Sequence, residues 1–199
     1  MNTAKGATIL PAIITTQKTG KEAFIFKNKE LPLNVLSFWQ WSSSELLGNA
    51  YRGVLAEFIV ASALDIADGF RVEWDEYDLK RKKGLKIEIK SSSYLQSWEQ
   101  EKLSVINFGI APTGKFQSRN PKRTRKSDVY IFCVLSHKDK DSVNPLDLSQ
   151  WDFYILKTKV LNKKVGSQKT ITLSSLLRLK PKKVKYSGIK KEIKRIEME

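Results

Sequence analysis

The chain has 199 residues, of which 41% are hydrophobic and 29% charged, a composition typical of a globular protein. Its net charge of +15 predicts a polyanionic partner, with nucleic acid ahead of an anionic membrane. The single cysteine, Cys133, excludes an intramolecular disulfide, and the single histidine, His137, argues against a zinc site or a histidine-based triad. No apolar run is long enough to predict a membrane span, and no signal peptide is recognisable, so we expect a cytoplasmic protein.

We expect residues 1–41 to form an N-terminal extension. It ends in an aromatic cluster, Phe38-Trp39-Gln40-Trp41, which is predicted to pack on the core or to join two copies into a homodimer. Ser42 and Glu45 then have the spacing of a capping box, which predicts the start of a helix.

The helix is predicted to resume over residues 49–64, which are apolar on nearly every side, as in a helix buried in an α/β core. Glu57 lies on an apolar stripe of this helix. A buried carboxylate without a partner is unfavourable, so Glu57 needs either an ion pair, for example with Arg52, or a place in a site that binds a cation.

The residues from Leu85 to Lys90 alternate between apolar and charged and predict a strand. Glu88 and Lys90, two residues apart, then point to the same face. A hairpin turn at residues 80–84 would bring Asp78 close to both. Two carboxylates and an amine at one point are typical of a metal-dependent hydrolytic site, although such alternation is also typical of a solvated strand face.

Further strands are predicted at 70–74, 103–110, 129–136, 151–156 and 169–172. Helical segments are predicted at 94–102, near 173–177, and after Ser187, where Ile189, Ile193 and Ile196 share one face. This order favours an α/β fold with a mixed central β-sheet flanked by helices. We expect the core to cover residues 42–160 and a basic C-terminal extension to cover residues 161–199.

A long segment, residues 111–127, is predicted to be a basic loop. Its six cationic residues either contact a nucleic-acid backbone or are simply solvated. They are Lys115, Arg119, Lys122, Arg123, Arg125 and Lys126.

The order of Glu57, Asp78 and Glu88-Ile89-Lys90 resembles the motif of the PD-(D/E)XK nuclease superfamily. Tyr77 stands where the motif's name has proline, and the stretch 52–98 is also similar to a group of uncharacterised bacterial proteins of this type. Asp75 is an alternative to Asp78 as the first acid. The resemblance implies a restriction-endonuclease-like core and a Mg²⁺-dependent DNA endonuclease, of the restriction, defence or repair type.

The resemblance also implies roles for individual residues. Asp78, Glu88 and the main-chain carbonyl of Ile89 would hold Mg²⁺, for which Mn²⁺ can substitute. Lys90 would orient the attacking water or stabilise charge on the phosphate, and Glu57 would complete the water shell or a second metal position. Gln96 resembles a glutamine that contacts the site in some members, although a surface amide on a helix is the simpler account.

The implied substrate is double-stranded DNA, and members that cut both strands often act as dimers. A non-catalytic nucleic-acid-binding protein on a nuclease-like fold is the main alternative. An RNA-binding protein is a third.

Overall fold

The computed structural model describes residues 10–11, 13–72, 76–112 and 123–199. It divides into two compact units, Met1–Ser42 and Ser43–Glu199. Each unit is described by itself.

The first unit contains a hairpin followed by a helix. Strands β1 (Ala23–Phe26) and β2 (Lys29–Asn34) pair antiparallel, and helix α1 spans Val35–Ser43. Lys27 and Asn28 form the turn with φ of 48° and 62°, the left-handed pair that suits a tight hairpin. The aromatic cluster lies on α1, where the Trp41 side chain is 85% exposed.

The helix start predicted at Ser42 is wrong, because Ser42 and Ser43 are the last residues of α1. The cap lies at Asn34 instead. The Ser37 N–H donates to Asn34 Oδ1 (2.9 Å), and the Asn34 N–H donates to Ser37 Oγ (3.1 Å). This reciprocal pair satisfies two main-chain donors at the helix start.

The second unit is built on a five-stranded sheet in the order β3-β4-β6-β7-β9. These strands span Leu79–Lys80, Lys86–Ser93, Val129–Leu135, Trp151–Lys157 and Lys182–Val184. Strands β4 and β6 are parallel and the other neighbours antiparallel, which confirms the predicted mixed sheet. A separate small sheet pairs β5 (Asn107–Gly109) with β8 (Thr170–Thr172).

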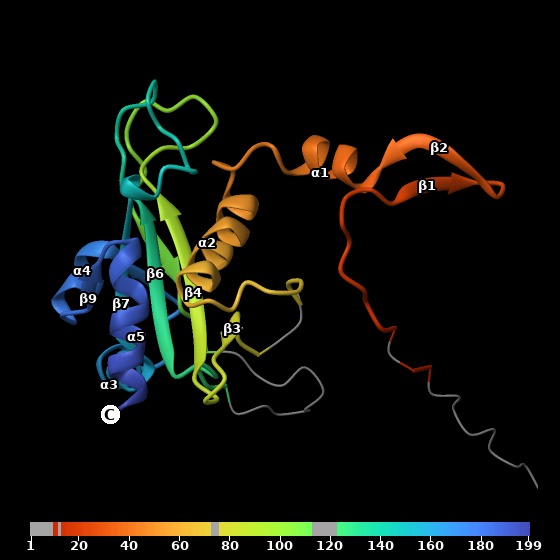
Figure 1. Ribbon diagram of the computed structural model, residues 1–199. Helices are drawn as coiled ribbons and strands as arrows, with labels where there is room; N and C mark the ends of the chain where they lie inside the picture. The colour runs from red at the N-terminus through yellow and green to blue at the C-terminus, as the bar shows by residue number, and fades with distance from the viewer. Residues whose placement is uncertain (1–9, 12, 73–75, 113–122) are drawn as a thin grey trace, which may run out of the picture. The chain divides into compact units, whose positions relative to one another are not determined.

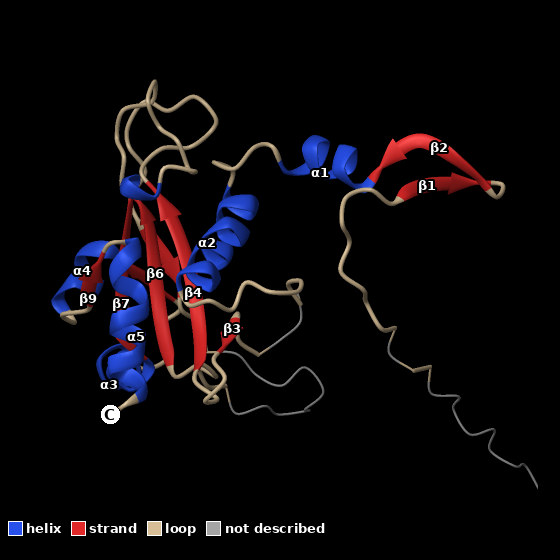
Figure 2. Cartoon of the chain, viewed as in Figure 1, coloured by secondary structure: helices blue, strands red, loops and turns tan. Residues whose placement is uncertain are grey.

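Helices cover both faces of the sheet (Figures 1 and 2). Helices α2 (Asn49–Ala63) and α5 (Ile189–Glu197) pack on one face, and α3 (Thr158–Val165) and α4 (Leu173–Arg178) contribute to the cluster on the other. The central strand β6 is buried on both faces, with Ile131 and Cys133 facing α2 and Phe132 facing the second cluster. A strand covered on both sides reads as a continuous apolar run, which is why β6 is evident in the sequence.

Three local elements differ from the sequence-based expectation. Residues 70–72 are not a strand, and residues 73–74 lie outside the described part of the chain. The strand expected at 103–110 is reduced to β5. Ser187 lies in a short 3₁₀ helix, Tyr186–Gly188, and does not cap α5; another 3₁₀ helix spans Leu148–Gln150.

The helix predicted at residues 94–102 is also absent from the structure, which has turns there. Two glutamine side chains take over the main-chain partners that a helix would use. Gln100 Oε1 accepts from the Gln96 N–H (2.6 Å), while Gln100 Nε2 donates to the Tyr94 carbonyl (3.2 Å). Side-chain bonds of this kind compete with the helical ladder.

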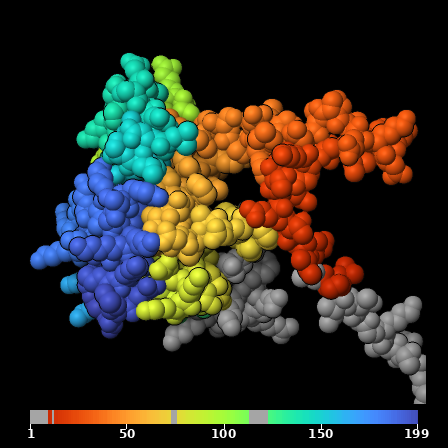
Figure 3. All heavy atoms as spheres, viewed as in Figure 1, coloured from red at the N-terminus to blue at the C-terminus, as the bar shows by residue number. Residues whose placement is uncertain are grey.

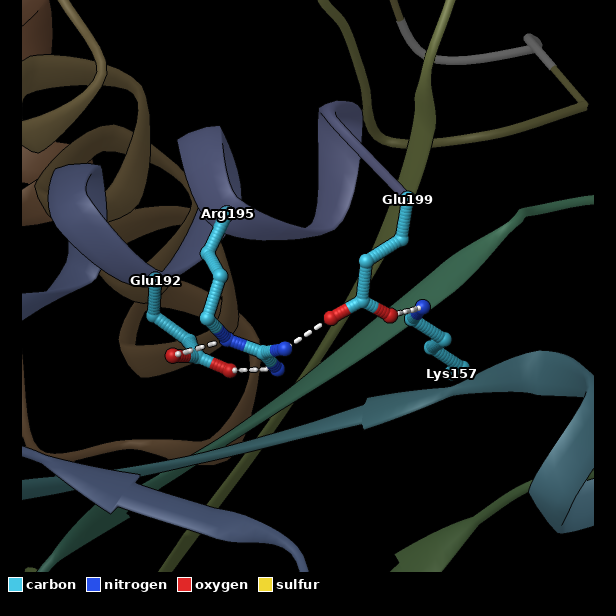
Figure 4. Close-up of polar contacts among 4 residues, drawn as sticks. All are labelled: Lys157, Glu192, Arg195 and Glu199. Atoms are coloured by element: carbon cyan, nitrogen blue, oxygen red, sulfur yellow. Dashed lines mark hydrogen bonds and ion pairs between the residues drawn. The ribbon is translucent and has the colours of Figure 1, made fainter.

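The C-terminal helix α5 is anchored by polar contacts as well as by its apolar face. Glu199 pairs with Lys157 at the end of β7 and with Arg195, which also holds Glu192 at 2.7 Å (Figure 4). Glu197 receives the Arg81 guanidinium at 3.1 Å from the turn between β3 and β4. These contacts tie α5 to β7 and to the β3–β4 hairpin.

None of the helices among the described residues combines the length and the apolar character needed to cross a membrane.

The face of α5 supplies a test of this packing. Ile193 is fully buried against α2 and the sheet, whereas Ile13 is 93% exposed. We expect Ile193→Ala to lower the free energy of unfolding by about 2–5 kcal/mol, because it removes buried methylene groups and leaves a cavity. Ile13→Ala, the matched control, should change it by less than about 0.5 kcal/mol in the same denaturant titration. Equal effects of the two substitutions would contradict the position of α5.

Candidate active site

The β3–β4 hairpin sets the register of the predicted acids. Leu79 lies opposite Ile87 and Lys80 opposite Lys86, and Gly84 closes the turn with a φ of 93°. The same register, continued by one residue, sets Asp78 opposite Glu88. Directly opposite residues of an antiparallel pair point to the same face and lie close enough to interact.

Strand β4 separates apolar from charged side chains. Ile87 and Ile89 are buried in the cluster beneath α2, so the alternate residues Glu88 and Lys90 lie on the other face. The side chain of Glu88 is only 20% exposed and that of Lys90 only 30%. This face is therefore partly enclosed, unlike the solvated face that was the alternative interpretation.

Asp78 lies at an open edge of the sheet. Only the first residues of β4 pair with β3, and no further strand covers that edge within the described residues. Asp78 Oδ2 accepts a hydrogen bond from the Ile89 N–H at 2.6 Å. The N–H and C=O of a strand residue point the same way, so the Ile89 carbonyl also faces this edge.

Two side chains hold the Glu88 carboxylate. Lys90 Nζ lies 2.7 Å from Oε1, and Ser127 Oγ donates to Oε2 at 3.0 Å. The adjacent strand places Tyr130 beside Glu88, where burial and then the Glu88 charge raise the pKa of the phenol. Glu88 is thus fixed by neighbours on both sides.

The electrostatic environment of Asp78 is unfavourable to its charge. Burial, followed by the negative charge of Glu88, raises its pKa from 3.8 to about 6, against the opposing effects of the Ile89 hydrogen bond and of Lys90. Glu57 adds a smaller contribution in the raising direction. Negative charges gathered in a partly buried place favour a proton or a cation there.

Glu57 forms an ion pair, as one of the two alternatives required, but its partner is Arg71 rather than Arg52. Arg71 Nε and Nη2 lie 2.5 and 3.1 Å from the two carboxylate oxygens. The Arg52 guanidinium instead binds the Leu47 carbonyl (2.8 Å) and Asn49 Oδ1 (2.6 Å). Glu57 lies on α2 and lines the same pocket as Asp78 and Leu79.

Gln96 is not brought together with the acids. It follows the end of β4 at the opposite end of the sheet from β3 (Figure 1). It is buried, and its side chain bonds to Arg52 (3.4 Å), the Ser93 carbonyl (3.3 Å) and Ser104 (3.2 Å). It is neither a site residue in this structure nor an amide on a helix surface, because it holds the loop after β4 together.

The predicted basic loop is only partly described. Lys115, Arg119 and Lys122 lie outside the described residues. Arg123 is exposed and Lys126 is half-buried, as phosphate contacts require.

Arg125 requires a correction. It is 8% exposed, and its guanidinium donates to Asn162 Oδ1 and to three carbonyls, those of Ile110, Gly166 and Gln168, at 2.7–3.0 Å. Burial lowers its pKa. A buried guanidinium with four of its five N–H donors engaged crosslinks loops, unlike the exposed phosphate-contacting side chain that the sequence predicted.

The oxygen donors at the open edge fit a hard divalent cation. Two carboxylates, Asp78 and Glu88, and the Ile89 carbonyl are the ligand types that Mg²⁺ prefers. Within the described ranges, no group of three or more His, Cys, Asp or Glu residues is positioned to hold a metal, so any site here rests on two acids and a carbonyl. Asp75, the alternative first acid, lies outside the described residues.

Sequence reasoning missed three residues around these acids. Ser127 lies just before β6 and donates a hydrogen bond to Glu88, and Tyr130 lies on β6 opposite Glu88. The parallel register of β4 and β6 is the feature that would have pointed to both residues. No sequence pattern pointed to Arg71 as a partner of Glu57, because Arg71 lies in an irregular segment.

A family model described as bacteriophage T4 endonuclease IV matches residues 5–175, which is most of the chain. No curated protein matches the sequence. The family match supports a DNA endonuclease, in agreement with the activity that the sequence predicted.

The raised pKa of Asp78 makes the stability of the chain depend on pH. Because folding favours the protonated acid, the contribution of Asp78 to stability should fall as pH rises from about 4 to about 6 and stay lower above that range. A shift of this size corresponds to about 3 kcal/mol. We therefore expect Asp78→Asn to be more stable than wild type above pH 6 in metal-free buffer, with the difference disappearing below pH 4. Denaturant titrations across this range measure it, and parallel stability curves would contradict the buried, acid-crowded position of Asp78.

Proposed function

We propose, since the chain belongs to the family of bacteriophage T4 endonuclease IV, that it is a Mg²⁺-dependent DNA endonuclease with an active site of the PD-(D/E)XK type. The observation that carries this proposal is the meeting of Asp78, Glu88 and Lys90 at one open strand edge. The mixed sheet, the acid-bearing hairpin and the helix α2 packed beside it support the same architecture.

In this proposal Asp78, Glu88 and the Ile89 carbonyl hold Mg²⁺. Bound there, the ion would supply charge to polarise a phosphate and would lower the pKa of a coordinated water. The Ile89 N–H orients the Asp78 carboxylate, and Ser127 orients that of Glu88. We leave Glu57 outside the ligand set, because Arg71 binds both of its oxygens.

Lys90 is the proposed electrostatic catalyst. It lies on the same face of β4 as Glu88 and is 2.7 Å from it. With Glu88 serving as a metal ligand, the Lys90 ammonium group would be able to donate to the attacking water or to a phosphate oxygen. A cation fixed near developing negative charge lowers the barrier because it needs little reorganisation.

The net charge of +15 supports attraction of DNA without sequence reading, through its phosphates. Arg123 and Lys126 are the described members of the basic segment that remain candidates for such contacts. We propose double-stranded DNA as the substrate, cut by a homodimer in which α1 contributes its exposed aromatic residues. A monomeric mass in solution would remove the dimer from this proposal.

The catalytic assignment is tested by cleavage. Wild-type protein should cut DNA with Mg²⁺ or Mn²⁺ and lose this activity in a chelator. Asp78→Ala and Lys90→Ala should each lower the rate at least about 100-fold, since each removes a group that acts on charge in the transition state. Lys102→Ala, an exposed lysine in the loop after β4, is the control and should cut normally.

Two results would contradict the assignment. Equal activity of wild type and the Asp78 and Lys90 variants would place the chemistry elsewhere. Salt-sensitive DNA binding without cleavage by any divalent metal would favour the alternative of a non-catalytic nucleic-acid-binding protein. If this binding also prefers RNA over DNA in a competition experiment, the RNA-binding alternative is favoured.

Ser127 is the proposed positioning residue for Glu88. Ser127→Ala removes its hydrogen bond and should weaken metal binding or activity by about 10- to 100-fold, as loss of such supporting contacts does. A merely structural role predicts loss of stability with an unchanged metal requirement. Activity should therefore be titrated against Mg²⁺ concentration, where the expected result is a higher half-saturating concentration and partial rescue by excess metal. An unchanged metal titration would remove Ser127 from the site.

A further inference from the structure

A pocket of about 430 Å³ opens next to the candidate active site. Its walls come from α2 and from the segment between α2 and β3, which adjoin in the space-filling view (Figure 3). Asp78 is one of its lining residues. Its volume is within the range of pockets that hold small organic molecules, about 300–1000 Å³.

The pocket has an apolar wall that remains exposed. Phe58 and Phe70 line it with 59% and 48% of their surface accessible, and Tyr77 lines it beside Asp78. Aromatic side chains left open in a concave surface favour a flat, unsaturated ligand, because ring faces can stack on them.

The same pocket contains one polar pair. The Glu57 carboxylate and the Arg71 guanidinium, joined by two bonds, both line it. A carboxylate has about four lone-pair sites, so two bonds from Arg71 leave Glu57 able to accept from a ligand. The pocket thus combines stacking surfaces with a hydrogen-bonding edge, the two features by which proteins hold an isolated base.

From these features we infer that the pocket takes one nucleobase of the DNA strand, next to the phosphate that the cation proposed at Asp78 and Glu88 would hold. This inference rests on the proposed function for its choice of ligand. Because Asp78 both lines the pocket and belongs to the proposed metal site, one DNA strand can reach both. A base enters such a pocket only after it has left the base stack, and stacking on aromatic side chains repays that separation.

Photocrosslinking tests the pocket without depending on cleavage. Wild-type protein in metal-free buffer is irradiated with a short DNA in which one base at a time is replaced by a photoreactive halogenated base, and the crosslinked peptide is identified by mass spectrometry. We expect crosslinks within residues 54–80, reduced about tenfold or more in Phe58→Ala. Trp98→Ala, an equally exposed aromatic residue beyond β4 (54%), is the matched control and should crosslink as wild type does.

A second test measures cleavage of DNA substrates that each lack one base. Removing the base at a single position relative to the cut should slow wild-type cleavage about 5- to 100-fold, a dependence that Phe58→Ala and Glu57→Gln should lose. Circular dichroism and melting curves first establish that each variant is folded.

The outcomes separate this inference from the proposed function. Crosslinks outside residues 54–80, on the N-terminal unit or the C-terminal helix, would overturn the base pocket. So would a cleavage rate that is indifferent to base removal at every position. Either result would leave the nuclease assignment standing if Asp78→Ala still abolishes cleavage. Crosslinks in the pocket of a chain that never cuts would overturn the nuclease assignment and support the pocket alone.

Discussion

The hydrogen bond from the Ile89 N–H to the Asp78 carboxylate is the contact on which the candidate site depends. It exists because β3 pairs with only the first residues of β4 and then leaves the edge open. If β3 continued alongside β4, its main chain would occupy the Ile89 N–H and carbonyl. The short strand therefore has a chemical consequence: it converts two main-chain groups from sheet partners into groups that can hold an acid and a cation.

Electrostatics then explains why the neighbours of Glu88 are needed. Burial, followed by the negative charge of Glu88, raises the pKa of Asp78 to about 6. Lys90 and Ser127 bind Glu88 from two sides, which keeps one carboxylate fixed while the other remains poorly satisfied. A site arranged in this way costs stability in the empty chain, which the proposed cation would restore on binding.

The sequence predicted the parts of this arrangement that depend on local alternation. Strand β4 and the apolar face of α5 repeat with the period of their elements, and strand β6 is a continuous apolar run, so burial follows directly from the pattern. The sequence did not reveal the contacts that irregular segments make. Arg71 reaches Glu57 from a segment without periodicity. Arg125 has the sequence context of a solvated cation, but in the structure three carbonyls from two loops surround it. Gln96 likewise resembles a site residue by spacing alone, because spacing along the chain does not reveal which end of the sheet a loop occupies.

The distribution of charge adds a constraint on how DNA is held. Several cations of the C-terminal segment are engaged in ion pairs: Lys183 and Lys185 with Asp152, Lys190 with Asp65, and Arg195 with Glu192 and Glu199. Ion pairing leaves the net charge of +15 unchanged, so long-range attraction of a polyanion persists. It does, however, reduce the number of side chains ready to form close phosphate contacts there. At the hairpin edge Lys90 pairs with Glu88, which the proposed metal would also bind. This edge is therefore the place where binding of DNA and binding of a cation would reinforce each other.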